Sequence, residues 1–408
     1  MMRSMFAGIS GLRSHQTMMD VVGNNISNVN TAGFKSSVVT FQEALSQTIQ
    51  GPTAAGADTG GANPIQIGLG VKVGSIDAVF TQGATQVTGR STDVAIQGDG
   101  FFVLDTAGSR EYTRAGNFSF DSDGNLVGNG GTRVMGWLAD STGVIDMSAS
   151  IQHVQIPLSQ VIDPVITTTV EVGGNLPADL PVGQATTTSI PVFDSLGNPH
   201  ELLLRFTNNA PNDWTLTGEI DGNVITVSAG NVTFGPDGAL TSASPITVSG
   251  YTPAGADPMS FDVEFQGDTP IVQYGGTDSM EAFQQDGNAI GFLRDVVIGT
   301  DGTITGQFSN GYTKPLGVVG MATFANPTGL MKAGDSRFEA STNSGEPLIG
   351  QAGTGNRGAM SAGTLEMSNV DLAQEFTNMI IAQRGFQANS RIITASDEIL
   401  ADLVNMKR

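Results

Sequence analysis

Three histidines are the residues of this 408-residue chain best suited to chemistry, because imidazole binds metal ions and transfers protons. His15, His153 and His200 lie far apart in the sequence and lack the short spacings that are typical of metal ligands. We therefore expect no metal site and no other cofactor. The chain contains no cysteine, which excludes disulfides, thiolate metal sites and cysteine nucleophiles.

Two segments rich in glycine and aspartate look like ligand-binding loops but lack the residues that define such loops. Residues 121–125 read DSDGN, with glycine fourth instead of sixth and no closing glutamate, so they predict a hairpin turn rather than a calcium loop. Gly98-Asp99-Gly100 precedes a predicted strand instead of a helix, which argues against a dinucleotide loop. We find no nucleophile-elbow or phosphate-loop pattern. The sequence predicts that the protein is not an enzyme.

The charge of the chain restricts its partners. There are 18 basic and 39 acidic side chains, a formal net charge of -21, which disfavours binding to nucleic acid or to anionic membranes. Residues 1–35 and 365–408 together carry seven positive and seven negative charges, so residues 36–364 hold the whole net charge. No apolar run approaches about 18 residues, so we expect no membrane insertion. The first residues also lack the pattern of a cleavable signal peptide, so any export is expected to retain them.

The first segment, residues 1 to about 29, is predicted to form an amphipathic helix. Its stripe recurs at alternating spacings of three and four residues, which is typical of a coiled-coil seam. The apolar members of that stripe are Met5, Ile9, Leu12, Met19 and Ile26. Amide and turn-forming residues follow and are expected to end the helix and start the exiting strand, namely Asn24, Asn25, Asn28, Asn30, Thr31, Gly33 and Phe34.

The last segment, residues 365–408, predicts a second helix with the same average period of 3.5 residues. Ser368 and Asp371 resemble a capping box, so the regular helix is expected to start near Asn369. Two arrangements stay open: a helical hairpin within one chain, or packing on several other copies, which the methionine-rich ends favour mildly. The apolar stripe consists of Leu365, Leu372, Phe376, Met379, Phe386, Ile393, Leu400 and Val404.

The residues between the helices predict β structure. Residues 51–70 are rich in Gly, Ala, Thr and Pro and indicate a linker or an extended arm. From residue 71 to about 324, short alternating or fully apolar runs predict strands, such as residues 101–104, and Asp-Gly pairs predict tight turns. Residues 220–224 form the clearest hairpin pattern. The predicted fold is a mainly β body inserted between N- and C-terminal α-helices that pair as a coiled-coil-like core.

Five segments resemble the bacterial flagellar rod–hook family in sequence, order and placement. They read SMFAGISG at 4–11, GNNISNVNTAGFK at 23–35, YTRAGNFSFDSDGN at 112–125, VMGW at 134–137, and SNVDLAQEFTNMIIAQRGFQAN at 368–389. The resemblance implies four regions: a terminal helical core at 1–34 and 365–408, linkers or extended arms at 35–70 and 345–364, an inner β domain at 71–147 and 285–344, and an outer β domain at 148–284.

The length of the chain resembles that of the hook branch of the family, since rod members are expected to be much shorter. The resemblance implies a structural subunit that assembles into a curved, flexible tube, a universal joint that transmits motor torque and surrounds the export channel. The implied location is the extracellular hook on the basal body. The implied partners are copies of the same chain, the distal rod protein, the hook cap, the hook–filament junction protein and the flagellar type III export apparatus.

Two alternatives to a hook subunit stay open. The first is a distal-rod or other axial protein of the flagellum, which polymer diameter and bending would distinguish. The second and more remote alternative is a secreted β protein that binds or acts on carbohydrate. Such a protein needs clustered aromatic and carboxylate side chains, and the sequence offers no such cluster.

Overall fold

The chain divides into two compact units in a computed structural model that describes residues 2–54, 60–157, 159–228, 230–267 and 269–406, excepting the side chains of residues 2, 3, 403 and 404. Unit 1 comprises residues 1–157, 296–305 and 314–408. Unit 2 comprises residues 158–295 and 306–313. The predicted outer domain, 148–284, shares most residues with unit 2, whereas the full four-region division stays a prediction.

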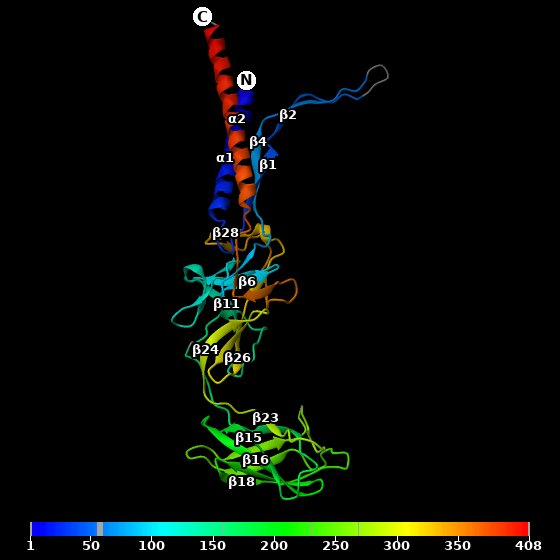
Figure 1. The fold of residues 1–408 in the computed structure, drawn as a ribbon. Helices are drawn as coiled ribbons and strands as arrows, with labels where there is room; N and C mark the ends of the chain where they lie inside the picture. The colour runs from blue at the N-terminus through cyan, green and yellow to red at the C-terminus, as the bar shows by residue number, and fades with distance from the viewer. Residues whose placement is uncertain (1, 55–59, 158, 229, 268, 407–408) are drawn as a thin grey trace. The chain divides into compact units, whose positions relative to one another are not determined.

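Two helices of unit 1 lie side by side, as Figure 1 shows: α1 (Met2–Ser27) and α2 (Leu372–Asn405). The predicted pairing of terminal helices is therefore confirmed. The predicted start of the second helix near Asn369 is wrong. Asp371 is the N-cap, because its Oδ1 accepts hydrogen bonds from the N–H groups of Ala373 at 2.8 Å and Gln374 at 3.3 Å. Ser368 instead accepts a weak bond from the N–H of Val370.

Leu365 lies in a strand and not in the C-terminal helix where its periodicity had placed it. Strand β32 (Thr364–Glu366) pairs antiparallel with β5 (Thr85–Val87), and Leu365 is opposite Gln86. The backbone of residues 364–366 is thus bonded to a neighbouring strand, which excludes helical hydrogen bonds at this point. Among the described residues, no helix is long and apolar enough to cross a membrane.

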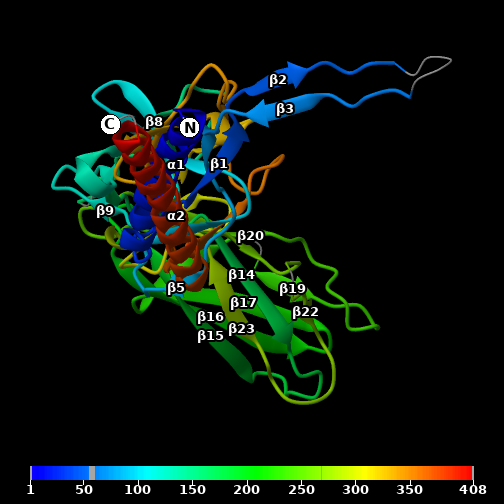
Figure 2. The ribbon, with the colours of Figure 1, turned by 90° about the horizontal axis from the view of Figure 1, so that it is seen from above.

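In unit 1, residues 37–50 and 65–78 form an antiparallel ribbon. At its base β1 (Ser37–Glu43) pairs with β4 (Val71–Ala78), and farther out β2 (Ser46–Gln50) pairs with β3 (Ile65–Gly68). Figure 2 shows β2 and β3 side by side. Every residue of both outer strands is exposed. The composition of residues 51–70 missed β3, in which β-branched Ile65 and Ile67 favour extended backbone.

The β body of unit 1 is built on a sheet that includes the order β26-β11-β7-β8-β29-β28. Its strands are β6 (Val94–Gln97), β7 (Phe101–Thr106), β8 (Ser109–Thr113), β9 (Ser119–Phe120), β10 (Leu126–Val127), β11 (Arg133–Leu138), β12 (Gln152–His153), β24 (Gly291–Ile298), β25 (Thr303–Phe308), β26 (Thr313–Val319), β27 (Met321–Thr323), β28 (Met331–Gly334), β29 (Arg337–Glu339), β30 (Leu348–Gly350) and β31 (Ala359–Ala362). Strands β24, β25 and β26 include residues of both units. Residues 101–104 are buried as predicted, and the ring of Phe101 meets those of Phe80, Phe324 and Phe338.

The loop at residues 121–125 connects β9 to β10 as the predicted hairpin turn. Asp121 Oδ1 accepts the N–H groups of Asp123 at 3.0 Å and Asn125 at 2.7 Å, and Gly124 has a φ of 79°. The carboxylate is therefore occupied by the backbone of its own turn.

Unit 2 contains a sheet in the order β15-β16-β17-β18-β20-β21-β14-β22, with β19 beside β17 and β23 beside β14. Its strands are β13 (Val161–Ile162), β14 (Thr169–Asn175), β15 (Ala185–Phe193), β16 (Pro199–Ala210), β17 (Asp213–Ile220), β18 (Asn223–Val227), β19 (Asn231–Thr233), β20 (Ile246–Tyr251), β21 (Met259–Glu264), β22 (Ile271–Val272) and β23 (Glu281–Gln285). One apolar cluster forms its core.

The period-two pattern places the core residues of unit 2 as predicted. Trp214, Leu216 and Ile220 on β17 are buried, and so are Phe261 and Val263 on β21. The turn between β17 and β18 has two residues, and both have positive φ, 52° at 221 and 78° at 222. That geometry matches the right-handed twist of the paired strands, which confirms the predicted hairpin.

We expect Phe206→Ala to reduce the free energy of unfolding of unit 2 by about 3–5 kcal/mol, because the ring is fully buried in its core. Urea unfolding followed by the fluorescence of buried Trp214, in a Trp137→Phe background, measures the change. Val224→Ala is the control, since Val224 is 78% exposed and should change stability by less than about 0.5 kcal/mol. Equal losses for the two variants would contradict the assigned core.

Candidate functional site

Small side chains bring the two helices of unit 1 together. A Cβ on Gly8 would lie 3.4 Å from Ile393, one on Gly11 would lie 2.7 Å from the amide of Asn389, and one on Gly385 would overlap the ring of His15. Residue numbers rise on α1 while they fall on α2, so the helices are antiparallel. An added Cβ at Gly11 or Gly385 would force the side chain of Asn389 or His15 to move, whereas one at Gly8 would make ordinary van der Waals contact.

The buried positions of α2 are small or polar. Glu375, Ala382 and Ser396 are each less than 9% exposed, and they recur at spacings of 7 and 14 residues. Several large apolar side chains of both helices are at least 37% exposed, namely Phe6, Ile9, Leu372, Phe376, Ile380, Ile381, Phe386, Ile392 and Ile399. Pairing within one chain therefore leaves apolar surface on both helices uncovered.

The structure distributes the predicted stripe residues between these two environments. Half-buried are Met5, Leu12, Met19, Ile26, Met379, Ile393 and Leu400. Exposed are Ile9, Leu372, Phe376 and Phe386. Leu365 belongs to β32, and the side chain of Val404 lies outside the described ones. Packing of these residues on other copies stays a prediction.

Asn25 connects both helices to the first strand at the base of the pair. Its Nδ2 donates to the Ser37 carbonyl at 2.8 Å and to Glu375 Oε1 at 3.2 Å, and its Oδ1 accepts the Ser37 N–H at 3.0 Å. The side chain is 1% exposed. The Asn25 amide thus pairs with both backbone groups of Ser37, as a neighbouring strand would. It also binds Glu375 in the first turn of α2.

The other residues of the predicted turn motif shape the chain after α1. Asn28 donates to the Asn24 carbonyl at 2.9 Å and accepts from the Thr31 hydroxyl at 3.1 Å, while Asn30 is exposed. Gly33 has a φ of 67°, and its N–H donates to the Glu366 carbonyl at 2.8 Å. A Cβ there would lie 2.7 Å from the Cα of the neighbouring residue 115, so glycine is required for conformation and for space.

A buried ionic cluster follows this turn. Lys35 Nζ lies 2.6 Å from Glu366 Oε1 and donates to the Thr81 carbonyl at 2.8 Å, and both charged side chains are fully buried. Arg114 Nη1 lies 3.4 Å from Glu366 Oε2, and its guanidinium is 5.3 Å from the ring centroid of Phe101. Burial lowers the pKa of the Lys35 amine, and its ion pair with Glu366 partly restores it. One carboxylate therefore balances two buried cations.

Asn369 completes the connection on the other side. Its Oδ1 accepts the Ser36 N–H at 2.8 Å, and its Nδ2 donates to the Val79 carbonyl at 2.8 Å and to the Thr81 hydroxyl at 2.9 Å. Sequence reasoning missed these roles of Lys35, Arg114, Glu366 and Asn369. Lys35, Arg114 and Asn369 lie within the five family-like segments. An ionisable or amide side chain inside such a segment was the signal that could have indicated a structural role.

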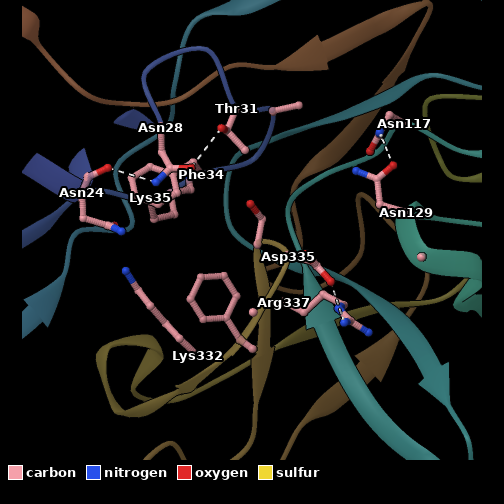
Figure 3. A pocket seen from close by; sticks show the side chains of 15 residues that line it. Asn24, Asn28, Thr31, Phe34, Lys35, Asn117, Asn129, Lys332, Asp335 and Arg337 are labelled. Carbon is pink, nitrogen blue, oxygen red and sulfur yellow. Dashed lines mark hydrogen bonds and ion pairs between the residues drawn. The ribbon is translucent and has the colours of Figure 1, made fainter. Parts of the chain in front are cut away.

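A cavity of about 690 Å³ opens beside this junction, and Figure 3 shows the side chains that line it. Asn28 lies between Asn24 and Thr31 in a hydrogen-bonded row. Lys332 Nζ is 5.3 Å from the ring centroid of Phe34 and donates to Ser37 Oγ at 2.8 Å. Amides, two amines, two aromatic rings and the charged side chains of Asp335 and Arg337 line it, a mixture that suits packing against polypeptide.

The histidines occupy three separate environments. His15 lies at the helix seam, His153 Nε2 is 3.7 Å from a carboxylate oxygen of Asp105, and His200 lies in unit 2. Within the described ranges, no three His, Asp or Glu side chains are grouped so that they could hold a metal ion.

Four family models match the chain over separate ranges. They are described as Flagella basal body rod protein at residues 5–35, Flagellar hook protein FlgE/F/G D1 domain at 95–174, Flagellar basal body protein FlaE D2 domain at 177–288, and Flagellar basal body rod FlgEFG protein C-terminal at 361–406. The first range covers α1 from residue 5 onward, and the last range contains all of α2.

Full-length relatives extend this similarity. The flagellar hook protein FlgE of Treponema pallidum is 39% identical over 464 residues, covering 100% of both chains. The flagellar basal-body rod protein FlgG of Bacillus subtilis is 34% identical over 409 residues, also covering 100% of both. The expectation that rod members are much shorter does not hold for that relative. The crystal structure of Helicobacter pylori flagellar hook protein FlgE2 matches 69% of this chain and 100% of its own, with a TM-score of 0.53 at 16% identity, which shows similarity of fold.

We expect Glu366→Gln to reduce the free energy of unfolding of unit 1 by about 3–5 kcal/mol, because it leaves buried Lys35 without a carboxylate. Urea unfolding followed by Trp137 fluorescence, in a Trp214→Phe background, measures the loss. Asp335→Asn breaks an ion pair with Arg337 in which Asp335 is 68% exposed, and it should cost less than about 1 kcal/mol. A loss no larger than that of the control would rule out the importance of the buried pair.

Burial raises the pKa of the Glu375 carboxyl, and the hydrogen bond from Asn25 offsets only part of this effect. A raised folded-state pKa means that the stability linked to this group is complete below the unfolded value near 4.5 and is lost as pH rises through the folded-state pKa. Glu375→Gln, which stays neutral and can keep the Asn25 bond, should weaken this decline. Urea unfolding followed by helical circular dichroism at several pH values compares the two proteins, and identical pH slopes would refute the prediction.

Proposed function

Because this chain belongs to the family of flagellar hook proteins FlgE, we propose that its exposed helix faces pack on neighbouring copies to build the core of the hook. Family membership makes it a structural subunit of the flagellar hook that polymerises into the flagellar axis, and not an enzyme.

The uncovered apolar face of the helices is the observation that supports this packing. Phe376 is 52% exposed and Ile380 is 58% exposed, one turn apart on α2. Complete burial of such a side chain contributes about 1.5–3 kcal/mol. Exposure of this apolar strip to water is unfavourable, and its burial against helices of other copies would be favourable.

The charge distribution supports the same arrangement. The helical ends have no net charge, so they can be packed densely without repulsion. Unit 2 contains 17 acidic and 2 basic residues, a net charge of −15. Such a unit is favoured at a solvent-facing position, where water and salt screen it. We therefore place the helices in the tube core and unit 2 on its outside.

Other partners and the export route follow from the role of a hook subunit. The distal rod protein, the hook cap, the hook–filament junction protein and the flagellar type III export apparatus are the proposed partners. Export is proposed to proceed without removal of the first residues, since they form the helix that the core requires. The fully exposed strands β2 and β3 are proposed to contact neighbouring subunits.

A distal-rod subunit is the second candidate, and the full-length relative named as a rod protein supports it. The two candidates differ in mechanics, because a rod is straight and stiff whereas a hook is curved. Electron micrographs of polymers assembled from the purified chain distinguish them by curvature. Straight polymers alone would favour the rod.

We expect the double variant Phe376→Ser/Ile380→Ser to assemble only at a concentration about 100-fold higher, since each exposed apolar side chain contributes about 1.4 kcal/mol or more to packing on a neighbour. Sedimentation of polymer against total protein measures the critical concentration. Gln387→Ser, at an exposed polar position of α2, is the matched control. Unchanged assembly of the double variant would show that this face is not an interface.

A further inference from the structure

His200 lies between two carboxylates in unit 2. Its Nδ1 is 2.6 Å from Asp221 Oδ2, and its Nε2 is 3.3 Å from Asp194 Oδ2. The side chain of His200 is 13% exposed and that of Asp194 is 1% exposed. Both ring nitrogens therefore face acceptors, and the site is closed on the Asp194 side but open at Asp221, whose side chain is 41% exposed.

Only the protonated ring can satisfy both contacts. A neutral imidazole carries one N–H, so its other nitrogen would present a lone pair to a carboxylate oxygen. The imidazolium carries two N–H groups and one positive charge, and it can donate to both oxygens.

The two carboxylates belong to different turns that the ring connects. Asp194 follows β15, and its Oδ1 also accepts the N–H groups of Leu196 and Asn198 at 2.9 and 2.8 Å. Asp221 is the first residue of the β17–β18 hairpin turn, and its Oδ1 accepts the Glu201 N–H at 3.1 Å. The Asp194 carboxylate thus organises its own turn, whereas the Asp221 carboxylate is bonded to the backbone of β16. His200 at the start of β16 is the cation between them.

One further titratable group faces this site. The Tyr251 hydroxyl, at the end of β20, donates to Asp221 Oδ2 at 3.0 Å and lies 3.3 Å from His200 Nδ1. Burial alone would lower the pKa of His200, but the hydrogen bonds and charges of Asp221 and Asp194 outweigh it and raise the pKa above 6.5. The net charge of −15 on unit 2 acts in the same direction.

We propose that His200 is a pH-dependent clasp that joins the Asp194 and Asp221 turns of unit 2 only while its ring is protonated. Loss of the proton breaks one of the two contacts. We expect the contact to Asp194 to break, because it is the longer one and because the Asp194 carboxylate keeps its backbone donors. The two turns are then no longer connected through a cation. Unit 2 therefore changes its local stability at a pH set by one residue, independently of how copies of the chain pack.

The sign of the effect follows from the raised pKa. The folded state binds the proton more tightly than the unfolded chain, so the clasp is complete below about pH 6.5 and is lost as pH rises through the folded-state pKa. His153 is the comparison within the chain, because a single carboxylate lies near it, at 3.7 Å.

Titration of the three histidine ring signals by NMR, on the full chain labelled with ¹³C-histidine below its assembly concentration, tests the proposal. His15→Gln and His153→Gln assign the signals by elimination, so the assignment does not require a variant at His200 to fold. We expect His200 to titrate above 6.5 and Asp221→Asn to lower its midpoint. A midpoint at or below 6.5, or one unchanged in Asp221→Asn, would overturn the proposal.

Unfolding of unit 2 provides the second readout. Urea midpoints followed through Trp214, in a Trp137→Phe background, should be higher near pH 6 than near pH 9 for the parent chain. His200→Gln should remove most of that difference, and His153→Gln should retain it. Retention of the full difference in His200→Gln would show that other groups cause it.

Discussion

A dry contact between one amine and one carboxylate joins the ends of the chain to the β body of unit 1. Lys35 and Glu366 are 331 positions apart, yet their charged atoms lie 2.6 Å from each other with no exposed surface. A buried charge is tolerated only beside its partner, so any shift of β32 against the segment after α1 would leave both charges unpaired. The pair therefore specifies the register in which the two ends meet. Asn25 and Asn369 then attach the main chain on either side of that pair.

The two helices use different faces for different contacts. Glycines on both helices allow the helices of one chain to approach closely, while the bulky apolar groups point elsewhere. The predicted helical hairpin is present, and it leaves apolar side chains exposed that are available for the proposed packing on neighbouring copies. Glu375 lies on the seam and binds Asn25, so the hairpin and the junction below it share one hydrogen-bonded group.

The sequence predicted what depends on local spacing and missed what depends on distant partners. Asp221-Gly222 specified a hairpin because two positive φ angles are required there, and alternation placed Trp214 and Phe261 in a core. Leu365 was assigned to the wrong element, because it continues the apolar period of the helix while its backbone pairs with Gln86.

The helix cap and the junction were harder to predict. Asp371, directly before the helix, is the N-cap instead of Ser368, because its carboxylate accepts hydrogen bonds from two N–H groups of the first turn. The period of large apolar residues did not separate seam from outer surface, because the predicted stripe contains both half-buried and exposed positions and none of the seam glycines. The Lys35–Glu366 pair has no local signature at all, since nothing near Lys35 in the sequence indicates a partner in the last tenth of the chain.

Separation of the glycine seam from the bulky outer surface has a consequence for substitutions. If these outer groups pack on neighbouring copies as proposed, substitutions among them would change the contacts between protomers while the hairpin keeps its shape. At Gly11 and Gly385 an added side chain would instead displace Asn389 or His15 inside the hairpin. Changes to the assembly and changes to the hairpin therefore belong to different positions on the same two helices.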